Sequence, residues 1–248
     1  MKLAVCINHV ADTASKISIA SDGKNIDKTG VTFILNPYDE YALEECLRLK
    51  EKNTGEVIAV SLGGDSHKET LRKALAMGVD KAMLIKDDSP RDSFAVARAL
   101  ADELREISAD VIFFGKQSVD SDNAAVGTMV AEILGLPSVS VAVKLEITNG
   151  IVTAEREIEG GKEKVQATLP AVITAQKGLN EPRYPSLKGI MSAKNKPIEE
   201  KVPTPSHVKA EVMAMYKPPS KNAGKIIGTD VSAVPELVRL LHEEAKVI

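Results

Sequence analysis

One loop of this sequence, residues 115–127, has the composition of a phosphate-binding site. It follows the apolar run 111–114 and leads into a helical pattern. Either Ser121 or Asp122 is placed to cap a helix that begins near Asn123, because a serine or aspartate oxygen accepts hydrogen bonds from the first helical turn. The remaining N–H groups of that turn, together with the helix dipole, would attract an anion.

Small side chains in this loop favour close contact between an anion and the backbone. Ala124, Ala125 and Gly127 leave the N–H groups of residues 123–126 open to a ligand. The loop matches neither of the usual glycine-rich phosphate motifs, and an ordinary capped helix without a ligand would show the same pattern. From these residues alone, both interpretations stay open.

Two other loops follow apolar runs and could contribute to the same site. The first is Asn8 to Asp12, and the second contains Ser61, Leu62 and Gly63. Ligands bind an open parallel sheet outside the carboxyl ends of its strands. A plain strand-to-helix turn would also explain Gly63.

Other reactive side chains form no pattern that indicates chemistry. Cys6 and Cys46 lie in apolar segments and belong to no CxxC pair, so we expect buried thiols in a reducing compartment. The four histidines are far apart in the sequence and fit no metal spacing, and we expect solvated or capping roles for them. No metal site and no hydrolase triad is predicted.

Alternation of short apolar runs with amphipathic segments up to about residue 136 predicts an α/β fold. The runs at 3–7, 57–62, 82–85 and 111–114 are uninterrupted, which is typical of parallel strands covered on both faces. The segments between them place apolar residues at helical spacing. We therefore expect a Rossmann-like parallel sheet with helices on both faces.

The pattern changes after Pro137. Asn149-Gly150 between apolar runs predicts an antiparallel hairpin insertion before a buried strand at 171–175. From about Ser192 the chain is proline-punctuated and has no regular period, which predicts an extended C-terminal arm that wraps another subunit and ends in an amphipathic helix. We expect residues 1–191 to form the α/β domain and 192–248 to form the arm and the helix.

Bulk properties exclude several classes of protein. The 248 residues carry a formal net charge of -3 and only 3% aromatic residues, which argues against nucleic-acid binding. No apolar run reaches the roughly 20 residues that a membrane span needs. We expect a cytoplasmic protein, or one of the mitochondrial matrix in a eukaryote, although the chain shows no transit peptide.

The segment 179–191, LNEPRYPSLKGIM, has the character of a docking loop. Two prolines stiffen it, which lowers the entropy cost of ordering it against a partner. Leu179 stands among polar neighbours like an apolar anchor. Nearby lysines and Arg183 either keep the chain soluble or steer it toward acidic partner surfaces.

This segment resembles the signature loop of the electron-transfer flavoprotein beta subunits. Five other stretches of the chain are similar to patterns of that family: Val10-Ala11-Asp12, Asn36-Pro37, Ala74 to Gly78, Gly115-Lys116-Gln117 with Asp120 and Asp122, and Glu155 to Gly161. The resemblance covers most of the chain, from about residue 3 to 197.

The resemblance implies a nucleotide-binding domain that pairs with a larger alpha subunit, with FAD at their interface. It implies electron entry from acyl-CoA dehydrogenases or related flavin enzymes and exit to a membrane quinone oxidoreductase. The expected cofactor-binding residues are Asn8, Val10, Ala11, Asn36, Ser61, Leu62, Gly63, Gly115, Asp120, Asp122, Asn123, Ala124, Ala125, Val126 and Gly127. The expected docking residues are Leu179, Asn180, Glu181, Pro182, Arg183, Tyr184, Lys188 and Met191.

Ordinary members of the family bury an AMP in this subunit, whereas electron-bifurcating members place a second FAD there and oxidise NADH. Bifurcating sequences usually have Gly-Asp-Thr-Ala-Gln-Val-Gly-Pro where this chain has residues 121–128, Ser-Asp-Asn-Ala-Ala-Val-Gly-Thr. We therefore expect AMP and an electron-transfer protein rather than an enzyme. The alternatives are the bifurcating form and a stand-alone adenine-nucleotide sensor.

Overall fold

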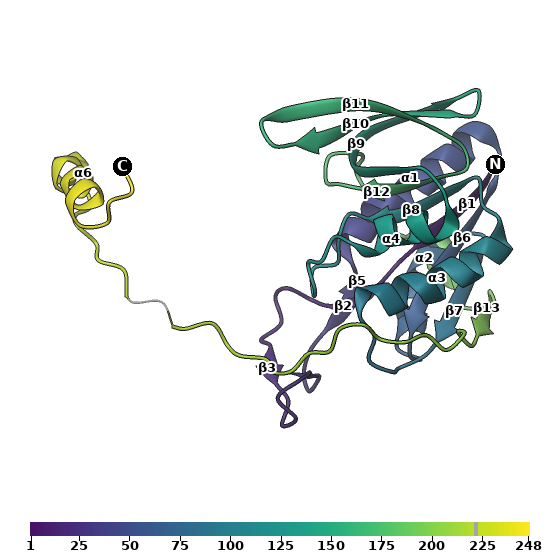
Figure 1. Cartoon of the computed structure of the whole chain (residues 1–248), viewed down its shortest axis with the longest axis horizontal. Coiled ribbons are helices and arrows are strands. Elements are labelled where there is room, and N and C mark those ends of the chain that lie inside the picture. The colour runs from purple at the N-terminus through teal and green to yellow at the C-terminus, as the bar shows by residue number, and fades with distance from the viewer. Residues whose placement is uncertain (221–222) are drawn as a thin grey trace.

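Apolar strands from most of the chain assemble into one nine-stranded sheet in the computed structural model, which describes residues 1–220 and 223–248 (Figure 1). In chain order its strands are β1 (Lys2–Cys6), β6 (Glu56–Gly63), β7 (Lys81–Lys86), β8 (Val111–Gly115), β9 (Ser138–Thr148), β10 (Ile151–Ile158), β11 (Gly161–Thr168), β12 (Ala171–Ala175) and β13 (Ile198–Lys201). Their order across the sheet is β11-β10-β9-β12-β8-β1-β6-β7-β13.

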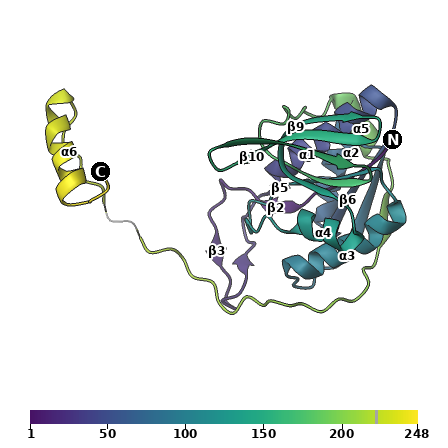
Figure 2. The ribbon, with the colours of Figure 1, turned by 45° about the horizontal axis from the view of Figure 1, so that its top comes forward.

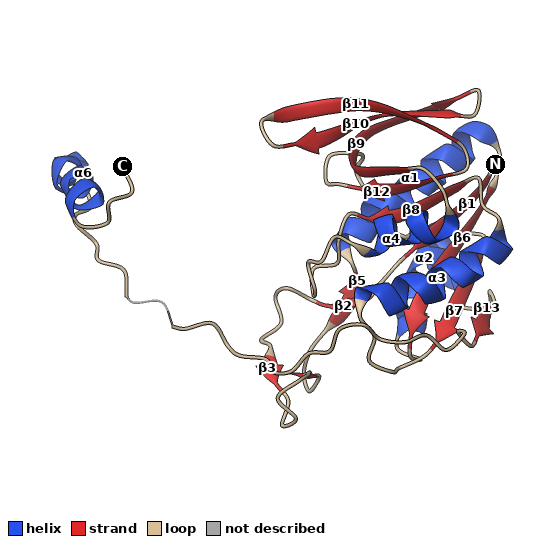
Figure 3. Ribbon diagram, viewed as in Figure 1, coloured by secondary structure: helices blue, strands red, loops and turns tan. Residues whose placement is uncertain are grey.

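Shorter strands and the helices complete the described parts of the chain (Figure 3). Two small sheets pair β2 (His9–Ala11) with β5 (Phe33–Leu35) and β3 (Ser18–Ile19) with β4 (Ile26–Asp27). The helices are α1 (Pro37–Asn53), α2 (His67–Met77), α3 (Ser93–Ile107), α4 (Val126–Leu134), α5 (Leu187–Ala193), the 3-10 turn η1 (Val231–Ala233) and α6 (Val234–Glu243).

The strand order places the start of the chain at the centre of the sheet. β1 pairs in parallel with both β6 and β8. The chain leaves β1 through β6 and β7, then crosses back to the other side of β1 and continues through β8 and β12. The predicted parallel α/β sheet is confirmed, and the reversal between β1 and β8 creates a topological switch point, where ligands usually bind.

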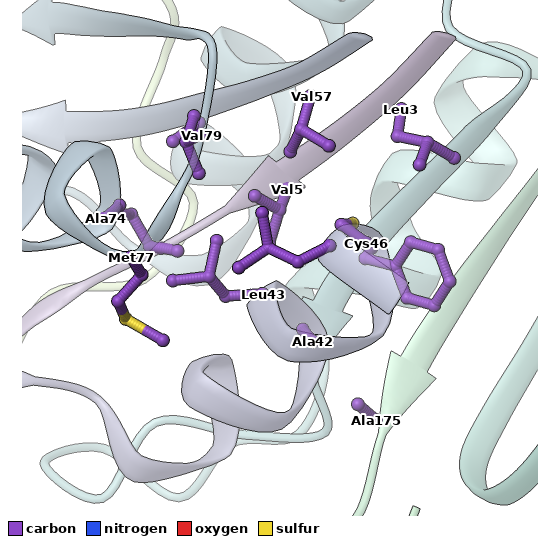
Figure 4. Close-up of a cluster of buried hydrophobic side chains, with 14 of the residues drawn as sticks. Leu3, Val5, Ala42, Leu43, Cys46, Val57, Ala74, Met77, Val79 and Ala175 are labelled. Carbon is purple, nitrogen blue, oxygen red and sulfur yellow. The ribbon is translucent and has the colours of Figure 1, made fainter. Parts of the chain in front are cut away.

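Both faces of β1 are buried, which explains its uninterrupted apolar sequence. Leu3 and Val5 pack with α1 and α2 on one face, whereas Ala4 and Cys6 pack with α3 and α4 on the other. Figure 4 shows the first cluster, in which side chains of β1 and β6 meet the α1 helix. The predicted helices on both faces, and the burial of both cysteines, are confirmed.

The predicted hairpin insertion is the antiparallel ribbon β9–β10–β11. Asn149 and Gly150 both have positive φ, of 51° and 76°, which is the backbone that a two-residue hairpin turn of the right twist requires. β9 also pairs in parallel with β12, so the ribbon continues the main sheet rather than forming a separate layer.

The start of the arm differs from the sequence prediction. Ser192, the first residue assigned to the arm, lies inside α5, and residues 198–201 form β13, which pairs in parallel with β7 at the edge of the sheet. Backbone hydrogen bonds hold this edge strand, so it needs no apolar side chains. Its charged sequence, IEEK, therefore lacks the alternation of apolar and polar residues that predicts a strand.

Beyond β13 the arm runs along the body to the β3–β4 hairpin, and α6 lies away from the sheet (Figures 1 and 2). Val234, Leu237 and Val238 of α6 are exposed, which agrees with an apolar face meant for another surface. Among the helices that the structure describes, none combines the length and the apolar character needed to cross a membrane.

Candidate functional site

A cavity opens at the switch point between β1 and β8. The empty space at this site, including the solvent at its mouth, is about 730 Å³. Ile7 and Asn8 line it from the end of β1, and residues 115–118 line it from the end of β8. The start of α4 forms a third wall.

The carboxylate of Asp39, in the first turn of α1, joins the two strand ends that flank the cavity. It accepts hydrogen bonds from the N–H of Asn8, at 2.8 Å, and of Gly115, at 2.9 Å. Burial raises the pKa of Asp39 to about 7, while both backbone donors act in the opposite direction by favouring the charged form. Sequence analysis missed Asp39, because an acidic residue early in a helix is common for reasons of the helix dipole alone.

The buried side chain of Asn36 supports the loop that follows β8. Its amide nitrogen donates to the carbonyl of Gln117, at 2.9 Å, and its oxygen accepts from the N–H of Val119, at 3.2 Å. The Asn36 side chain thus supplies the hydrogen-bond partners that a neighbouring strand would otherwise offer to the backbone of Gln117 and Val119. It acts behind the cavity rather than among the lining residues.

The backbone leading into α4 forms an unusual series of free donors. Asp122 and Ala124 have positive φ, 52° and 50°, which is strained for residues other than glycine. Within the described residues, the N–H groups of residues 123–128 have no protein acceptor. A concave run of free amides at a helix N-terminus is the geometry that binds anions in many proteins.

The helix starts later than the sequence indicated. We predicted a start near Asn123 with Ser121 or Asp122 as the cap, but α4 begins at Val126 and its N-cap, Ala125, makes no side-chain hydrogen bond. Asp122 instead accepts a hydrogen bond from the Gln117 side chain, at 2.7 Å. The shift leaves more free amides than a standard capped start would.

Apolar side chains also line the cavity. They are those of Cys6, Leu62, Val96, Leu100 and Phe114. Burial raises the pKa of the Cys6 thiol, so the thiol stays protonated. The cavity therefore combines apolar side chains with backbone N–H groups that have no acceptor in the described protein, an arrangement suited to a heterocycle joined to an anion.

The structure brings eight of the fifteen predicted cofactor residues to this cavity. These are Asn8, Leu62, Gly115, Asn123, Ala124, Ala125, Val126 and Gly127. Lining residues that sequence analysis did not select are Cys6, Ile7, Asp39, Val60, Val96, Leu100, Phe114, Lys116, Gln117, Ser118 and Ser121. The apolar ones looked like ordinary core residues of strands and of a helix.

The other predicted cofactor residues lie beside the cavity. Val10 is buried and Ala11 is half-buried in β2, and Asp122 binds Gln117. The Ser61 hydroxyl pairs with Nδ1 of His67, at 2.9 Å, and a Cβ at Gly63 would collide with the same histidine ring. Burial lowers the pKa of His67 to about 4, so this half-buried histidine is neutral. We had expected a solvated or capping role for it.

Asp120 lines a second, wider space that adjoins the first. This space, of about 1980 Å³, lies between the N-terminus of α3, the loop before α4 and arm residues 208–212. The carboxylate of Asp92 holds the arm there, because it accepts from the N–H groups of Lys209 and Ala210, at 2.6 and 2.7 Å. Both spaces share Asn8, Val96, Ser118, Ser121, Asn123, Ala125 and Val126.

The predicted docking residues fall into two groups. Leu179 is half-buried and packs against the core cluster on the α1 face, and the side chains of Asn180 and Arg183 bind α1. Pro182 is also half-buried, whereas Glu181, Tyr184, Lys188 and Met191 are exposed. The exposed residues of the second group present the most surface to a partner.

The raised pKa of Asp39 predicts pH-dependent stability. Between the ordinary value, near 3.8, and about 7, the folded chain binds more protons than the unfolded chain, so the stability that Asp39 contributes is lost as pH rises through that window. The free energy of unfolding of the natural chain minus that of Asp39→Asn should fall by up to about 4 kcal/mol between pH 4 and pH 7. Urea denaturation of both chains measures the difference, and a constant difference would mean an always ionised carboxylate.

Comparison with known proteins agrees with this fold. Residues 24–206 match the electron transfer flavoprotein domain. The chain is 42% identical over 259 residues to electron transfer flavoprotein subunit beta of Bacillus subtilis (strain 168), with the whole of both proteins covered. It is 42% identical over 225 residues to the beta subunit of Syntrophomonas wolfei, covering 90% of this chain and 88% of that protein, and 38% identical over 257 residues to the mitochondrial beta subunit of Arabidopsis thaliana, with both fully covered. The chain therefore belongs to the electron transfer flavoprotein family, among its beta subunits.

Proposed function

We propose that this chain is the electron-carrier subunit of a heterodimeric electron transfer flavoprotein and that it binds AMP as a structural ligand. A larger alpha subunit would share FAD with it at their interface, and that FAD would supply the redox chemistry. Acyl-CoA dehydrogenases or related flavin enzymes would donate the electrons, and a membrane quinone oxidoreductase would accept them. The observation that carries the proposal is the row of free amides that meets an apolar wall at the switch point.

The residues of the cavity fit an adenosine monophosphate. The N–H groups of residues 123–127, which line the cavity, would hold the phosphate, since they have no acceptor in the described protein. Leu62, Val96 and Phe114 would contact the flat base. Bound there, the nucleotide would link the end of β1 to the start of α4 and stiffen the subunit.

No side chain in this proposal acts as an acid, base or nucleophile. The chain's role is to hold the nucleotide, to form part of the interface with the alpha subunit and to dock the electron donor. The exposed apolar face of α6 and the arm that precedes it would pack on the alpha subunit. The exposed residues Tyr184, Lys188 and Met191 would meet the dehydrogenase.

A second FAD in place of AMP is the alternative favoured by one observation. The nucleotide cavity continues into the space of about 1980 Å³ beneath the arm, which has room for more than a mononucleotide. In that case the complex would be an NADH-oxidising, electron-bifurcating enzyme. The sequence of residues 121–128 supports AMP, because it lacks the glutamine and proline of the bifurcating pattern.

Nucleotide content separates these functions. We expect the complex purified with its alpha subunit to release one FAD and one AMP per heterodimer when it is denatured and its nucleotides are separated by chromatography. Two FAD and no AMP would establish the bifurcating form. A chain that remains monomeric in size-exclusion chromatography with the co-expressed alpha subunit would leave the nucleotide-sensor function instead.

Gly127 tests the amide cradle directly. A Cβ at this position would lie 2.8 Å from Cγ2 of Thr174, so Gly127→Ala should push the start of α4 away from the sheet and reduce the AMP content by about tenfold or more. Thr174→Ser removes that methyl group but keeps the hydroxyl that accepts from the N–H of Val141. The double variant should regain part of the AMP. An unchanged AMP content in Gly127→Ala would place the nucleotide elsewhere.

Docking is tested by two variants of the segment 179–191. Tyr184→Ala removes a side chain that is 94% exposed, so it should raise the KM for the dehydrogenase by roughly tenfold and leave nucleotide content and heterodimer formation intact. Leu179→Ala should also weaken reduction, with a loss of stability as well, because Leu179 packs on the core. Unchanged reduction rates across a titration of dehydrogenase would contradict docking at this segment.

A further inference from the structure

Arg183 faces its own chain. Its Nε lies 2.8 Å from Oε2 of Glu44 and its Nη2 lies 2.9 Å from Oε1 of the same carboxylate, so the pair is bidentate. The guanidinium also binds the carboxylate of Glu51, two turns further along α1. The backbone N–H of Arg183 donates to Glu44 as well, at 3.1 Å.

The burial of Glu44 shows that this contact is internal. Glu44 is only 4% exposed, so a partner protein cannot reach it while the segment is in place. Both carboxylates raise the pKa of Arg183 and offset its charge. A cation paired in this way offers little to a docking protein compared with free lysines such as Lys188.

Asn180 provides a second attachment three residues earlier. Its Nδ2 donates to the carbonyl of Tyr41, at 3.0 Å, and to Oε2 of Glu45, at 2.9 Å. Since Pro182 lies between the two attachments, the backbone from 180 to 183 has little freedom to leave α1.

The other end of the segment is fixed to α2. A Cβ at Gly189 would lie 2.2 Å from the carbonyl oxygen of Ala76, so α5 approaches the α2 backbone closely. Ser186 caps α5 by accepting from the N–H of Gly189, at 3.0 Å. The segment is therefore held at both ends.

Between and just beyond these attachments lies a group of exposed apolar side chains. Tyr184, Leu187 and Met191 are 94%, 83% and 71% exposed. Large apolar residues this exposed are typical of interaction sites. Tyr184 follows Arg183 directly, so the position of the Arg183 backbone sets that of Tyr184. Leu187 and Met191 lie in α5, which packs closely on α2 at Gly189.

We propose that Arg183 is a positioning residue: its bidentate contact with Glu44 holds Tyr184 in place beside Leu187 and Met191 for the electron-donating dehydrogenase, which does not read the charge of Arg183. The proposal rests on the proposed function. Because the contact depends on the planar fork of the guanidinium, a lysine at 183 cannot replace it. An immobilised surface docks at lower entropic cost than a mobile one.

The test compares Arg183→Lys and Glu44→Gln in the complete heterodimer. With an acyl-CoA dehydrogenase and its substrate, both variants should raise the KM for the carrier by roughly tenfold, while kcat and the rate of reduction by dithionite stay within about twofold of the natural protein. Hydrogen exchange of the amides of residues 180–186 should accelerate by roughly tenfold in both, with unchanged exchange in β1 as the control for folding.

Arg105→Lys is the matched control, because Arg105 pairs with Asp102 on α3, on the opposite face of the sheet. It should change neither the KM nor the exchange of residues 180–186. A natural KM in Arg183→Lys together with a raised KM in Arg183→Met would show that the dehydrogenase reads charge, and would overturn the proposal. So would a natural KM in Glu44→Gln, or a loosened segment with no rise in KM.

Failure of the proposed function gives a different result. In that case the dehydrogenase would reduce neither the natural heterodimer nor any of the variants. The hydrogen-exchange measurement would still test whether the contact between Arg183 and Glu44 fixes the segment, since unchanged protection of residues 180–186 in Glu44→Gln would show that it does not.

Discussion

A single buried carboxylate links the ends of the two strands between which the candidate site opens and sets the distance between them. Asp39 takes one backbone N–H from each strand end, at Asn8 and at Gly115, and so fixes the width of the switch point. Removing a carboxylate from water costs several kcal/mol, and two charge-assisted hydrogen bonds offset part of that cost. The glycine at 115 is required as well, because a Cβ there would strike both the Asp39 carboxylate and the α1 backbone. This junction also fixes where the loop that leads from β8 to the free amides before α4 begins.

The sequence predicts the sheet, its helices and the hairpin ribbon well, because burial on two faces and the Asn149-Gly150 turn leave strong local patterns. It does not predict β13, whose pairing with β7 joins residues more than 100 positions apart through the backbone. The start of α4 was placed too early for a related reason. Capping rules follow side chains, whereas the N-cap of this helix, Ala125, makes no side-chain hydrogen bond.

The site could be predicted only in part, and the reason is chemical. Backbone amides leave no mark on residue type, so the loop 115–127 could be found but its donors could not be assigned individually. Phe114 and Leu100, which line the cavity, have the sequence character of core residues. We expected Arg183 to face a partner. Its contact with Glu44 joins residues 139 positions apart, and no local sequence pattern shows such a pairing.

Both margins of the nine-stranded sheet carry charge. At one margin, β11 exposes Lys162, Glu163 and Lys164, and at the other, β13 exposes Glu199 and Glu200. An open sheet offers unpaired N–H and C=O groups along its outer strands, and another copy of the chain can add to them and begin an aggregate. Pairing of such a strand with a second copy would remove water from its charged side chains and bring like charges together. Both effects oppose the formation of an intermolecular sheet. The fold thus keeps an open sheet with two free margins while resisting self-association into fibres.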